Sequence, residues 1–459
     1  MKIIRKAAIA QSNSLGIQKI DINKNYRPFT YSMSVRCEDG LLLYNNLTDE
    51  LILLNANDEN AIKCKDFSSD IFTLLIKKWF FVPKENDDAN LCNQINNFMH
   101  LLVDTYGVNQ PITQYTILTT TDCNARCFYC YEMGRKRINM TPKIANDVAD
   151  YIIKSCNGEK VTFRWFGGEP LCNSIAIDII CNKLTDNGIE YQSGMVSNGY
   201  LFDEVTIKNG IENWNLKQVQ ITLDGTEDVY NRCKAFIHDD PSPYQRVMRN
   251  IKLLLDYGVF VKIRMNADRH NMDDLFNLTD VLYEKFSEYS NMRVYSHLIF
   301  ENTGNNFNRD QKEQREIFNR HNDLLKYINE KGFITKATLH NYLRYQQCMA
   351  DNPSATVITP DGHLGRCEHF SENEFWGSIY SNEIDYGTIK RFKKVRVLPQ
   401  SCDNCPVKPA CIHLEMCPDT PQKCTDYIQE SYINNTRGRM INTYIEYKTG
   451  IKQSTDLWD

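Results

Sequence analysis

The chain has 459 residues, of which 42% are apolar and 24% charged, and its net charge is −5. This is globular composition, and the length suggests about two to four domains. The weakly negative net charge does not indicate a basic surface that would bind nucleic acid. No apolar run is long enough to predict a membrane helix. Polar residues follow the basic start too soon for a signal peptide. We expect a cytoplasmic protein that binds neither nucleic acid nor membrane.

The first hundred residues contain three strand patterns and then helical ones. Turn residues separate the strand candidates 30–37, 41–44 and 50–54 from one another. Helical stretches follow around 68–78 and 89–103. We therefore expect a small α+β domain over residues 1–105.

Strand and helix patterns then alternate over residues 106–335. Six successive β–α units predict a parallel sheet, either doubly wound or an incomplete barrel. Functional residues then belong at the carboxyl ends of the strands. The strand candidates are 115–120, 161–166, 189–197, 217–223, 259–266 and 292–300, and the helix candidates are 142–156, 174–187, 244–257, 273–286 and 310–331.

The 17 cysteines are unevenly distributed. A reducing cytosol disfavours disulfides, so the clustered cysteines indicate metal sites. The three groups are Cys123, Cys127 and Cys130; Cys348 and Cys367; and Cys402, Cys405, Cys411, Cys417 and Cys424. We expect a metal-stabilised domain over residues 336–430 and a helix with a polar tail over residues 431–459.

The first group has the spacing C-x3-C-x2-C directly after a predicted strand. Three thiolates can hold three irons of a 4Fe-4S cluster and leave the fourth iron open for catalysis. A zinc knuckle would need a fourth Cys or His nearby, and none lies between Thr105 and Lys154 apart from these three cysteines.

This motif and three later segments resemble the radical S-adenosylmethionine (SAM) superfamily. Its C-x3-C-x-aromatic-C signature is followed here by Gly167-Gly168-Glu169-Pro170, by Ser197-Asn198-Gly199 and by Thr222-Leu223-Asp224-Gly225. The resemblance implies a partial (β/α)6 barrel in which SAM binds the open iron and yields a radical that abstracts a substrate hydrogen. The implied cofactor-binding residues are Tyr129, which would lie near the adenine, Gly167, Gly168, Glu169, Pro170, Ser197, Asn198, Thr222, Asp224, Arg232 and Arg264.

Some roles stay open at this point. Relatives often carry a basic residue about ten positions after Asp224, and Arg232 and Lys234 both lie near that position. Arg264 and Asn266 could reach the pocket or stand at the edge of the core. The neighbours of the third cysteine, Tyr131 and Glu132, could serve either function or packing, and no general base is identified.

The C-terminal cysteines resemble the SPASM domain, which carries two auxiliary 4Fe-4S clusters. The resemblance implies an outer cluster on Cys402, Cys405, Cys411 and Cys424 and an inner one on Cys348, Cys367 and Cys417. The inner cluster is then one ligand short, since eight are needed and seven are present. His363, His369 and His413 are candidates for the eighth ligand or ordinary surface residues; two zinc ribbons are the alternative to clusters.

Enzymes with this pair of domains mostly modify peptides. The N-terminal region resembles the winged-helix-like recognition domain of ribosomal-peptide maturases, which would add the leader of a precursor peptide as a strand to its exposed edge. The resemblance implies a maturase that installs a thioether or carbon–carbon cross-link and receives electrons from a flavodoxin or ferredoxin. The alternatives are an anaerobic sulfatase-maturing (formylglycine-forming) enzyme and a non-catalytic, metal-stabilised peptide-binding protein.

Ten positioned cysteines predict three 4Fe-4S clusters. We expect about twelve iron and about twelve sulfide ions per chain after anaerobic reconstitution, measured by iron and sulfide assays. Stoichiometric zinc without the absorbance of a cluster would contradict this prediction.

Overall fold

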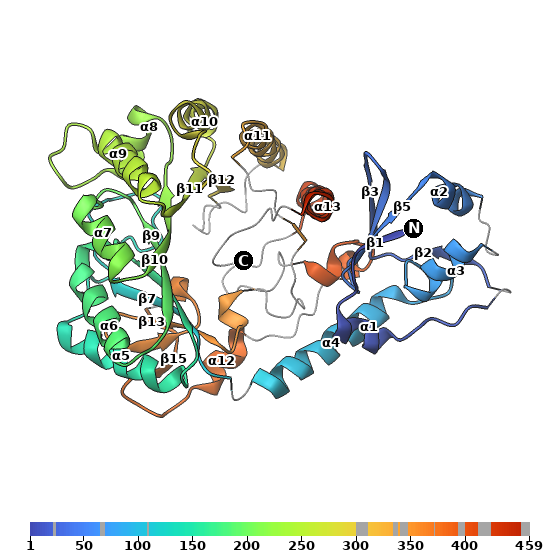
Figure 1. Ribbon diagram of the computed structural model, residues 1–459, viewed down its shortest axis with the longest axis horizontal. Helices are drawn as coiled ribbons and strands as arrows, with labels where there is room; N and C mark the ends of the chain where they lie inside the picture. Colours follow the sequence, from blue (N-terminus) through green and yellow to red (C-terminus); the bar gives the residue numbers. More distant parts are fainter. Residues whose placement is uncertain are drawn as a thin grey trace. The chain divides into compact units, whose positions relative to one another are not determined.

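The computed structural model describes residues 1–21, 24–64, 69–107, 110–299, 311–333, 338–339, 348–370, 372–392, 400–411 and 424–450. The chain divides into two compact units (Figure 1). Unit 1 comprises Met1–Val108, Lys336–Asp351 and Arg391–Asp459, and unit 2 comprises Asn109–Thr335 and Asn352–Lys390. Residues 336–430, which the sequence treats as one domain, are thus shared between the two units. The division into four domains stays a prediction.

Unit 2 is built on a nine-stranded sheet in the order β12-β11-β10-β9-β8-β7-β13-β14-β15. From β7 to β12 each strand pairs in parallel with the next one along the chain. The mixed α/β class with a parallel core is therefore confirmed. The six strands are β7 (Gln114–Thr120), β8 (Val161–Gly167), β9 (Tyr191–Ser197), β10 (Leu216–Thr222), β11 (Phe260–Ala267) and β12 (Met292–Leu298).

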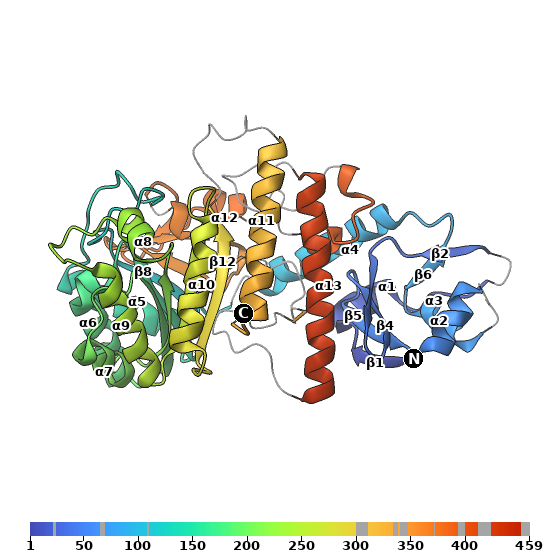
Figure 2. The same cartoon turned by 90° about the horizontal axis from the view of Figure 1, so that it is seen from above.

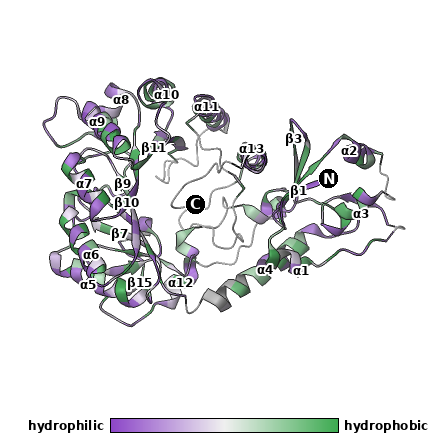
Figure 3. Ribbon diagram, viewed as in Figure 1, coloured by the Kyte–Doolittle hydropathy of each residue, from purple (hydrophilic) through white to green (hydrophobic). Residues whose placement is uncertain are grey.

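Helices alternate with these strands because each helix has one apolar face to bury. In α5, for example, Ala145, Val148, Ala149 and Ile152 are buried and join the main core of the unit. Figures 1 and 2 show α5, α6, α7, α9 and α10 on one face of the sheet, and Figure 3 shows polar residues interspersed along them. The helices are α5 (Pro142–Ser155), α6 (Ser174–Asp186), α7 (Glu204–Glu212), α8 (Glu227–Lys234), α9 (Pro243–Asp256), α10 (Met272–Phe286) and α11 (Gln311–Glu330), with the 3-10 turns η1 (Pro170–Asn173) and η4 (Glu368–Phe370).

Three short strands from the Cys-rich region extend this sheet. β13 (Ala355–Ile358) lies parallel to β7, and β14 (His363–Gly365) and β15 (Phe375–Ser378) follow as antiparallel neighbours. The sequence did not predict this pairing, since β13 has only four residues and its partner lies far away in the chain. Helix α12 (Tyr386–Phe392) comes next.

Unit 1 contains a four-stranded sheet in the order β1-β5-β4-β3. β3, β4 and β5 confirm the predicted meander, and β1 adds an unpredicted edge strand with an irregular register. The elements are β1 (Lys2–Arg5), α1 (Ile9–Leu15), β2 (Tyr26–Pro28), β3 (Ser32–Cys37), β4 (Gly40–Asn45), β5 (Glu50–Leu54), α2 (Ala56–Lys63), α3 (Asp70–Lys77), β6 (Phe81–Pro83), α4 (Asp88–Gly107), η3 (Met349–Asp351), η5 (Gln400–Cys402), η6 (Lys408–Ala410) and α13 (Asp426–Thr449).

The two ends of the chain share a core in unit 1. Leu42 and Tyr44 of the meander pack with Val407 from the Cys-rich region and with Met440 and Tyr444 of α13. The hydroxyl of Tyr444 also donates to the carboxylate of Asp39. The N-terminal sheet and the last helix therefore depend on each other for burial. Within the described ranges, no helix has the length and apolar character needed to span a bilayer.

Candidate active site

The three cysteines of the first motif lie on the loop after β7, at the carboxyl edge of the parallel sheet. All three are half-buried. The amide of Ala125 donates to Cys123 Sγ over 3.4 Å, and the amide of Cys130 donates to the carbonyl of Cys127 over 3.1 Å. The thiol of Cys127 acts electrostatically on those of Cys123 and Cys130, so the three thiols lie in one region of the loop. A cluster with one open iron would need three thiols from one such region.

The surroundings of two of these thiols, Cys123 and Cys130, make them poor thiolates without a metal. Burial, together with the charge of Glu169, raises the pKa of Cys123 to about 12, and burial also raises the pKa of Cys130. A bound metal centre would supply the positive charge that deprotonates a coordinating thiol. The donor set therefore fits an iron–sulfur cluster better than it fits free thiol chemistry.

Two glycines let the end of β8 lie against this loop. A Cβ atom on Gly167, whose φ is +113°, would lie 2.0 Å from the carbonyl oxygen of Thr120, and one on Gly168 would lie 2.2 Å from that of Asp122. This close approach allows two backbone hydrogen bonds. The Gly168 amide donates to the carbonyl of Thr120 over 3.1 Å, and the Glu169 amide donates to the carbonyl of Asp122 over 2.9 Å. Only glycine fits at these two positions.

Glu169 joins the ends of β8 and β9. It is fully buried, and its carboxylate accepts hydrogen bonds from Ser197 Oγ (2.9 Å), the Asn198 amide (2.8 Å) and the Leu171 amide (3.3 Å). Burial raises the pKa of Glu169 to about 7. Asn198 Nδ2 in turn donates to Asn124 Oδ1 of the cysteine loop over 2.7 Å. Glu169 and Asn198 thus join the ends of β8 and β9 to the cysteine loop.

Pro170 follows Glu169 and is buried in the same place. Its carbonyl accepts a hydrogen bond from Thr119 Oγ1 over 3.2 Å. This contact connects η1 to the carboxyl end of β7. The whole Gly167–Pro170 segment is therefore adjacent to the base of the cysteine loop.

A buried three-residue network joins the cysteine loop to the end of β10. Lys234 Nζ lies 3.0 Å from Asp224 Oδ2 and donates to the hydroxyl of Tyr129 over 2.9 Å, and that hydroxyl donates to Asp224 Oδ2 over 2.5 Å. Burial opposes the charge of Lys234, but Asp224 and Tyr129 hold the pKa of the amine well above its ordinary value. Asp224 Oδ1 is buried and has no partner in the described part of the chain, so it is available to a bound ligand.

The structure decides between the two basic residues that the sequence left open. Lys234 is buried and makes the ion pair with Asp224, whereas Arg232 is exposed on α8. Positions two apart on a helix face different ways, which explains the difference. Of the two basic residues, Lys234 is therefore the one that pairs with Asp224. That Arg232 binds the cofactor stays a prediction.

Thr222 and Arg264 stand opposite each other at the ends of β10 and β11. The side chain of Arg264 donates to Asn266 Oδ1 over 2.9 Å. These residues share the carboxyl edge of the sheet with the cysteine loop. The hydrogen bond places the Arg264 side chain with Asn266 and not with the Asp224 network.

Residues just after the third cysteine contact the Cys-rich region of unit 2. The Tyr131 ring stacks on His369 with centroids 4.3 Å apart, and Arg135 donates to the carbonyl of His369 over 2.8 Å. Burial raises the pKa of Glu132 to about 7. Tyr131 and His369 therefore pack on each other, and His369 lies two residues after Cys367.

The auxiliary cysteines fall in both units. In unit 1, the pKa of Cys424 is raised to about 11 by burial and by the neighbouring thiols of Cys411, Cys402 and Cys405, so the four predicted ligands of the outer cluster are close together. Cys348 lies in unit 1 and Cys367 in unit 2. Two predicted residues, Cys417 and His413, lie outside the described residues.

Two further observations concern metal ligands. Among the described residues, no three His, Cys, Asp or Glu side chains are arranged around a point that would hold a single metal ion. His363, a candidate for the eighth ligand, stacks on Phe375 with ring centroids 4.3 Å apart. Cys172, which lies outside the three cysteine groups, is exposed and lies near Cys123.

Comparisons with known proteins agree with this geometry. Residues 117–282 match the family model described as the radical SAM superfamily. The GTP 3′,8-cyclase of Clostridium perfringens (strain SM101 / Type A) is 26% identical over 281 residues, which are 58% of this chain and 83% of that protein.

Two solved structures share the fold. The structure of histidine-tagged anSMEcpe with bound AdoMet superposes with a TM-score of 0.53 at 17% identity and covers 73% of this chain and 100% of its own. Streptococcus suis SuiB bound to the precursor peptide SuiA has a TM-score of 0.51 at 12% identity and covers 84% of this chain and 94% of its own. The chain therefore has the fold of these structures, and the part that matches the radical SAM model contains Cys123, Cys127 and Cys130.

The Asp224–Lys234 pair gives a stability prediction. Lys234→Met should lower the free energy of unfolding by about 3 kcal/mol, because it leaves a buried carboxylate without its counter-charge. The measurement is urea denaturation of the apoprotein followed by tryptophan fluorescence.

Arg232→Met on the same helix is the matched control and should change stability by less than about 0.5 kcal/mol, since Arg232 is exposed. The double variant Asp224→Asn with Lys234→Met should recover part of the loss. Equal effects of the two single methionine variants would show that the ion pair does not hold the loop.

Proposed function

We propose that this chain, with its radical SAM domain, is a maturase that abstracts hydrogen from a ribosomally made precursor peptide and installs a thioether or carbon–carbon cross-link. The observation that carries the proposal is the convergence of the cysteine loop, the Gly167–Gly168 turn and the Asp224–Lys234–Tyr129 network at one edge of the parallel sheet. That edge is where open α/β sheets bind their ligands.

Each group of residues has a part in this proposal. Cys123, Cys127 and Cys130 would hold the cluster, and the unpartnered Asp224 Oδ1 would accept a hydrogen bond from the cofactor. When bound, the cluster and SAM supply a carbon-centred radical by one-electron cleavage of the sulfonium. The residues of the chain orient the cofactor and exclude water. The buried Lys234–Asp224 ion pair holds Tyr129 in place before any ligand binds. Ligand binding therefore costs little conformational entropy in these side chains.

Peptide substrates are favoured because proteins of similar fold have been solved with bound peptides. SuiB is seen with its precursor peptide, and anSMEcpe is also seen with the peptide Cp18Cys. The SuiB comparison covers most of this chain, so it extends beyond the radical SAM domain. We infer that unit 1, with its sheet edge at β1, recognises the leader of the precursor by strand addition.

The remaining cysteines support auxiliary clusters in this proposal. An outer 4Fe-4S cluster would be held by Cys402, Cys405, Cys411 and Cys424, whose thiols are mutual neighbours. An inner one would be held by Cys348, Cys367 and Cys417. A flavodoxin or ferredoxin would deliver the electrons.

A second candidate follows from the sequence relatives. Several relatives are named GTP 3′,8-cyclases. The match to the Clostridium perfringens enzyme covers 83% of that enzyme's length, which favours a nucleotide substrate. The peptide proposal is separated from it by incubating the reduced, reconstituted enzyme with SAM and either GTP or short cysteine- or aromatic-rich peptides encoded beside the gene. A peptide product lighter by the mass of two hydrogens supports the cross-link, a lighter peptide with a formylglycine supports sulfatase-type maturation, and conversion of GTP alone overturns the peptide proposal.

The triple variant of Cys123, Cys127 and Cys130 to Ala should lose reductive cleavage of SAM, since no other set of cysteines would hold a cluster with an open iron in this domain. The measurement is 5′-deoxyadenosine formed under dithionite, quantified by chromatography. Iron content should fall by about one third while the auxiliary clusters remain.

Cys64→Ala is the matched control, because Cys64 is an exposed thiol of the α2 end and lies outside all three groups. It should retain the activity of the parent protein. Formation of 5′-deoxyadenosine by the triple variant would show that the radical site lies elsewhere.

A further inference from the structure

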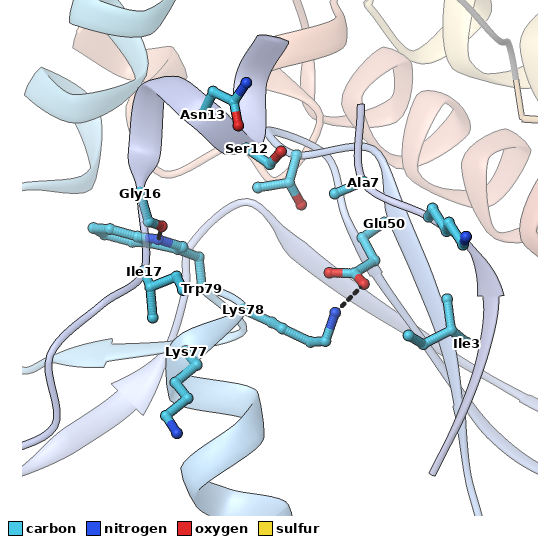
Figure 4. A pocket seen from close by; sticks show the side chains of 12 residues that line it. Ile3, Ala7, Ser12, Asn13, Gly16, Ile17, Glu50, Lys77, Lys78 and Trp79 are labelled. Atoms are coloured by element: carbon cyan, nitrogen blue, oxygen red, sulfur yellow. Dashed lines mark hydrogen bonds and ion pairs between the residues drawn. The ribbon is translucent and has the colours of Figure 1, made fainter. Parts of the chain in front are cut away.

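Unit 1 contains a pocket of about 500 Å³ between the end of β1, helix α1 and the turn after α3 (Figure 4). Ile17 and Trp79 form an apolar wall on one side of it, and Ile3 lines the opposite side, across the Lys78–Glu50 pair (Figure 4). Ile3 and Ile17 are 38% and 79% exposed. Large apolar side chains that remain in water around a hollow mark a binding surface more often than a packing defect.

The indole of Trp79 is held firmly at this wall. Trp79 has a φ of +63°, a left-handed conformation that bulky residues rarely adopt. Three hydrogen bonds hold it there: its amide donates to Ile76, Asn45 Nδ2 donates to its carbonyl over 2.9 Å, and its indole N–H donates to Gly16 over 3.0 Å. Such strain costs on the order of 1–3 kcal/mol and is retained where the surrounding structure needs the geometry.

The pocket is positively charged. Three lysines line it, against one carboxylate, Glu50. Lys78 pairs with Glu50 (Figure 4). Lys6 and Lys77 are exposed and make no ion pair within the described part of the chain. The whole chain has a net charge of −5, whereas the pocket has a local excess of two positive charges. This excess favours an anionic ligand.

A buried hydroxyl also faces this region without a partner. Thr48 lines the pocket and is 3% exposed, and its Oγ1 has no hydrogen-bond partner among the described residues. Its carbonyl is already used by the amide of Ala8 over 2.8 Å. Buried polar atoms are normally satisfied, so an orphaned hydroxyl indicates a ligand or a water molecule at this position.

The pocket adjoins an open sheet edge. β1 is the outermost strand of the four-stranded sheet and has no strand on its outer side within the described ranges. Lys6 and Ala7 of the pocket directly follow its last residue, Arg5. An extended peptide that adds to this edge would place alternate side chains toward the pocket, which is how strand addition acquires specificity.

We propose that this pocket anchors the leader of the precursor peptide through one large apolar side chain flanked by carboxylates in an extended segment. The apolar side chain packs against Trp79 and Ile17, and the carboxylates pair with Lys6 and Lys77. The inference rests on the proposed function for the identity of the peptide. A peptide is favoured over a nucleotide or an anionic lipid because the two lysines lie on different elements beside a strand edge, which only a polypeptide backbone can use.

The experiment is a peptide-display selection on the full-length, reconstituted protein. Clones are selected for binding and then depleted on the charge-reversed variant Lys6→Glu/Lys77→Glu. We expect surviving sequences enriched in Asp or Glu beside Leu, Ile, Phe or Trp, and synthetic versions should bind the variant at least about tenfold more weakly by fluorescence anisotropy. Survivors without acidic enrichment, or none that distinguish the two proteins, overturn the proposal.

Two further variants control for folding and for the site. Lys63→Glu/Lys84→Glu reverses two lysines of unit 1 that do not line the pocket and should leave peptide binding unchanged. Ile17→Ser removes an exposed apolar wall and should weaken the same peptides, with an unchanged thermal midpoint. If both double lysine variants weakened peptide binding equally, the effect would come from the overall charge of the protein. That result would contradict a specific pocket.

The same samples separate this inference from the proposed function. Reductive cleavage of SAM without peptide should be equal in the parent protein and in the pocket variants, because the cysteine loop lies in unit 2. Loss of peptide selection with normal SAM cleavage would refute the pocket alone. Pocket-dependent binding by a protein that cleaves no SAM would refute the maturase and leave the pocket as a peptide-binding site.

Discussion

The arrangement of the candidate active site depends on how Lys234 is buried. Its amine serves Asp224 and Tyr129, while its backbone carbonyl accepts the amide of Arg126 over 2.8 Å. One residue at the end of α8 therefore holds the cysteine loop both by side chain and by backbone. A charge so deeply buried is tolerated only when it is paired and hydrogen-bonded. The pairing fixes the position of the loop relative to β10.

A second constraint acts from the other side of the loop. Gly167 and Gly168 allow β8 to approach Thr120 and Asp122 so closely that no side chain would fit between them. Glu169 can then reach Ser197 and the Asn198 amide from a fully buried position. Glycines, a buried carboxylate and an ion pair together define the edge where a cluster and its cofactor would sit.

Unit 1 shows a different kind of dependence. The core that joins Leu42 and Tyr44 to Met440 and Tyr444 makes the N-terminal sheet and the last helix one folding unit. Removal of the first hundred residues would therefore expose that core and disturb the segment of Cys405, which packs in the same cluster. Point variants in the pocket are the cleaner way to test recognition, because Lys6 and Lys77 lie at the surface.

The sequence by itself determined the parallel α/β core and the identity of the first cysteine loop. Both depend on local patterns: period-two strands alternating with amphipathic helices, and three thiols at a spacing that suits one loop. It also predicted that Gly167, Asn198 and Asp224 follow successive strands. Their convergence at one edge then follows from parallel topology.

Only the tertiary structure decided the features that depend on contacts between distant segments. It selected Lys234 over Arg232, since the choice depends on which face of α8 is buried. It paired β13 with β7 and β1 with β5. The periodicity of a sequence does not show which strands pair, and β1 and β13 have only four residues each. The pocket beside Trp79 is likewise assembled from segments that carry no distinctive pattern of their own in the sequence. Burial and pairing across such separations are properties of the folded chain, because the energy of each contact is realised only when both partners are in place.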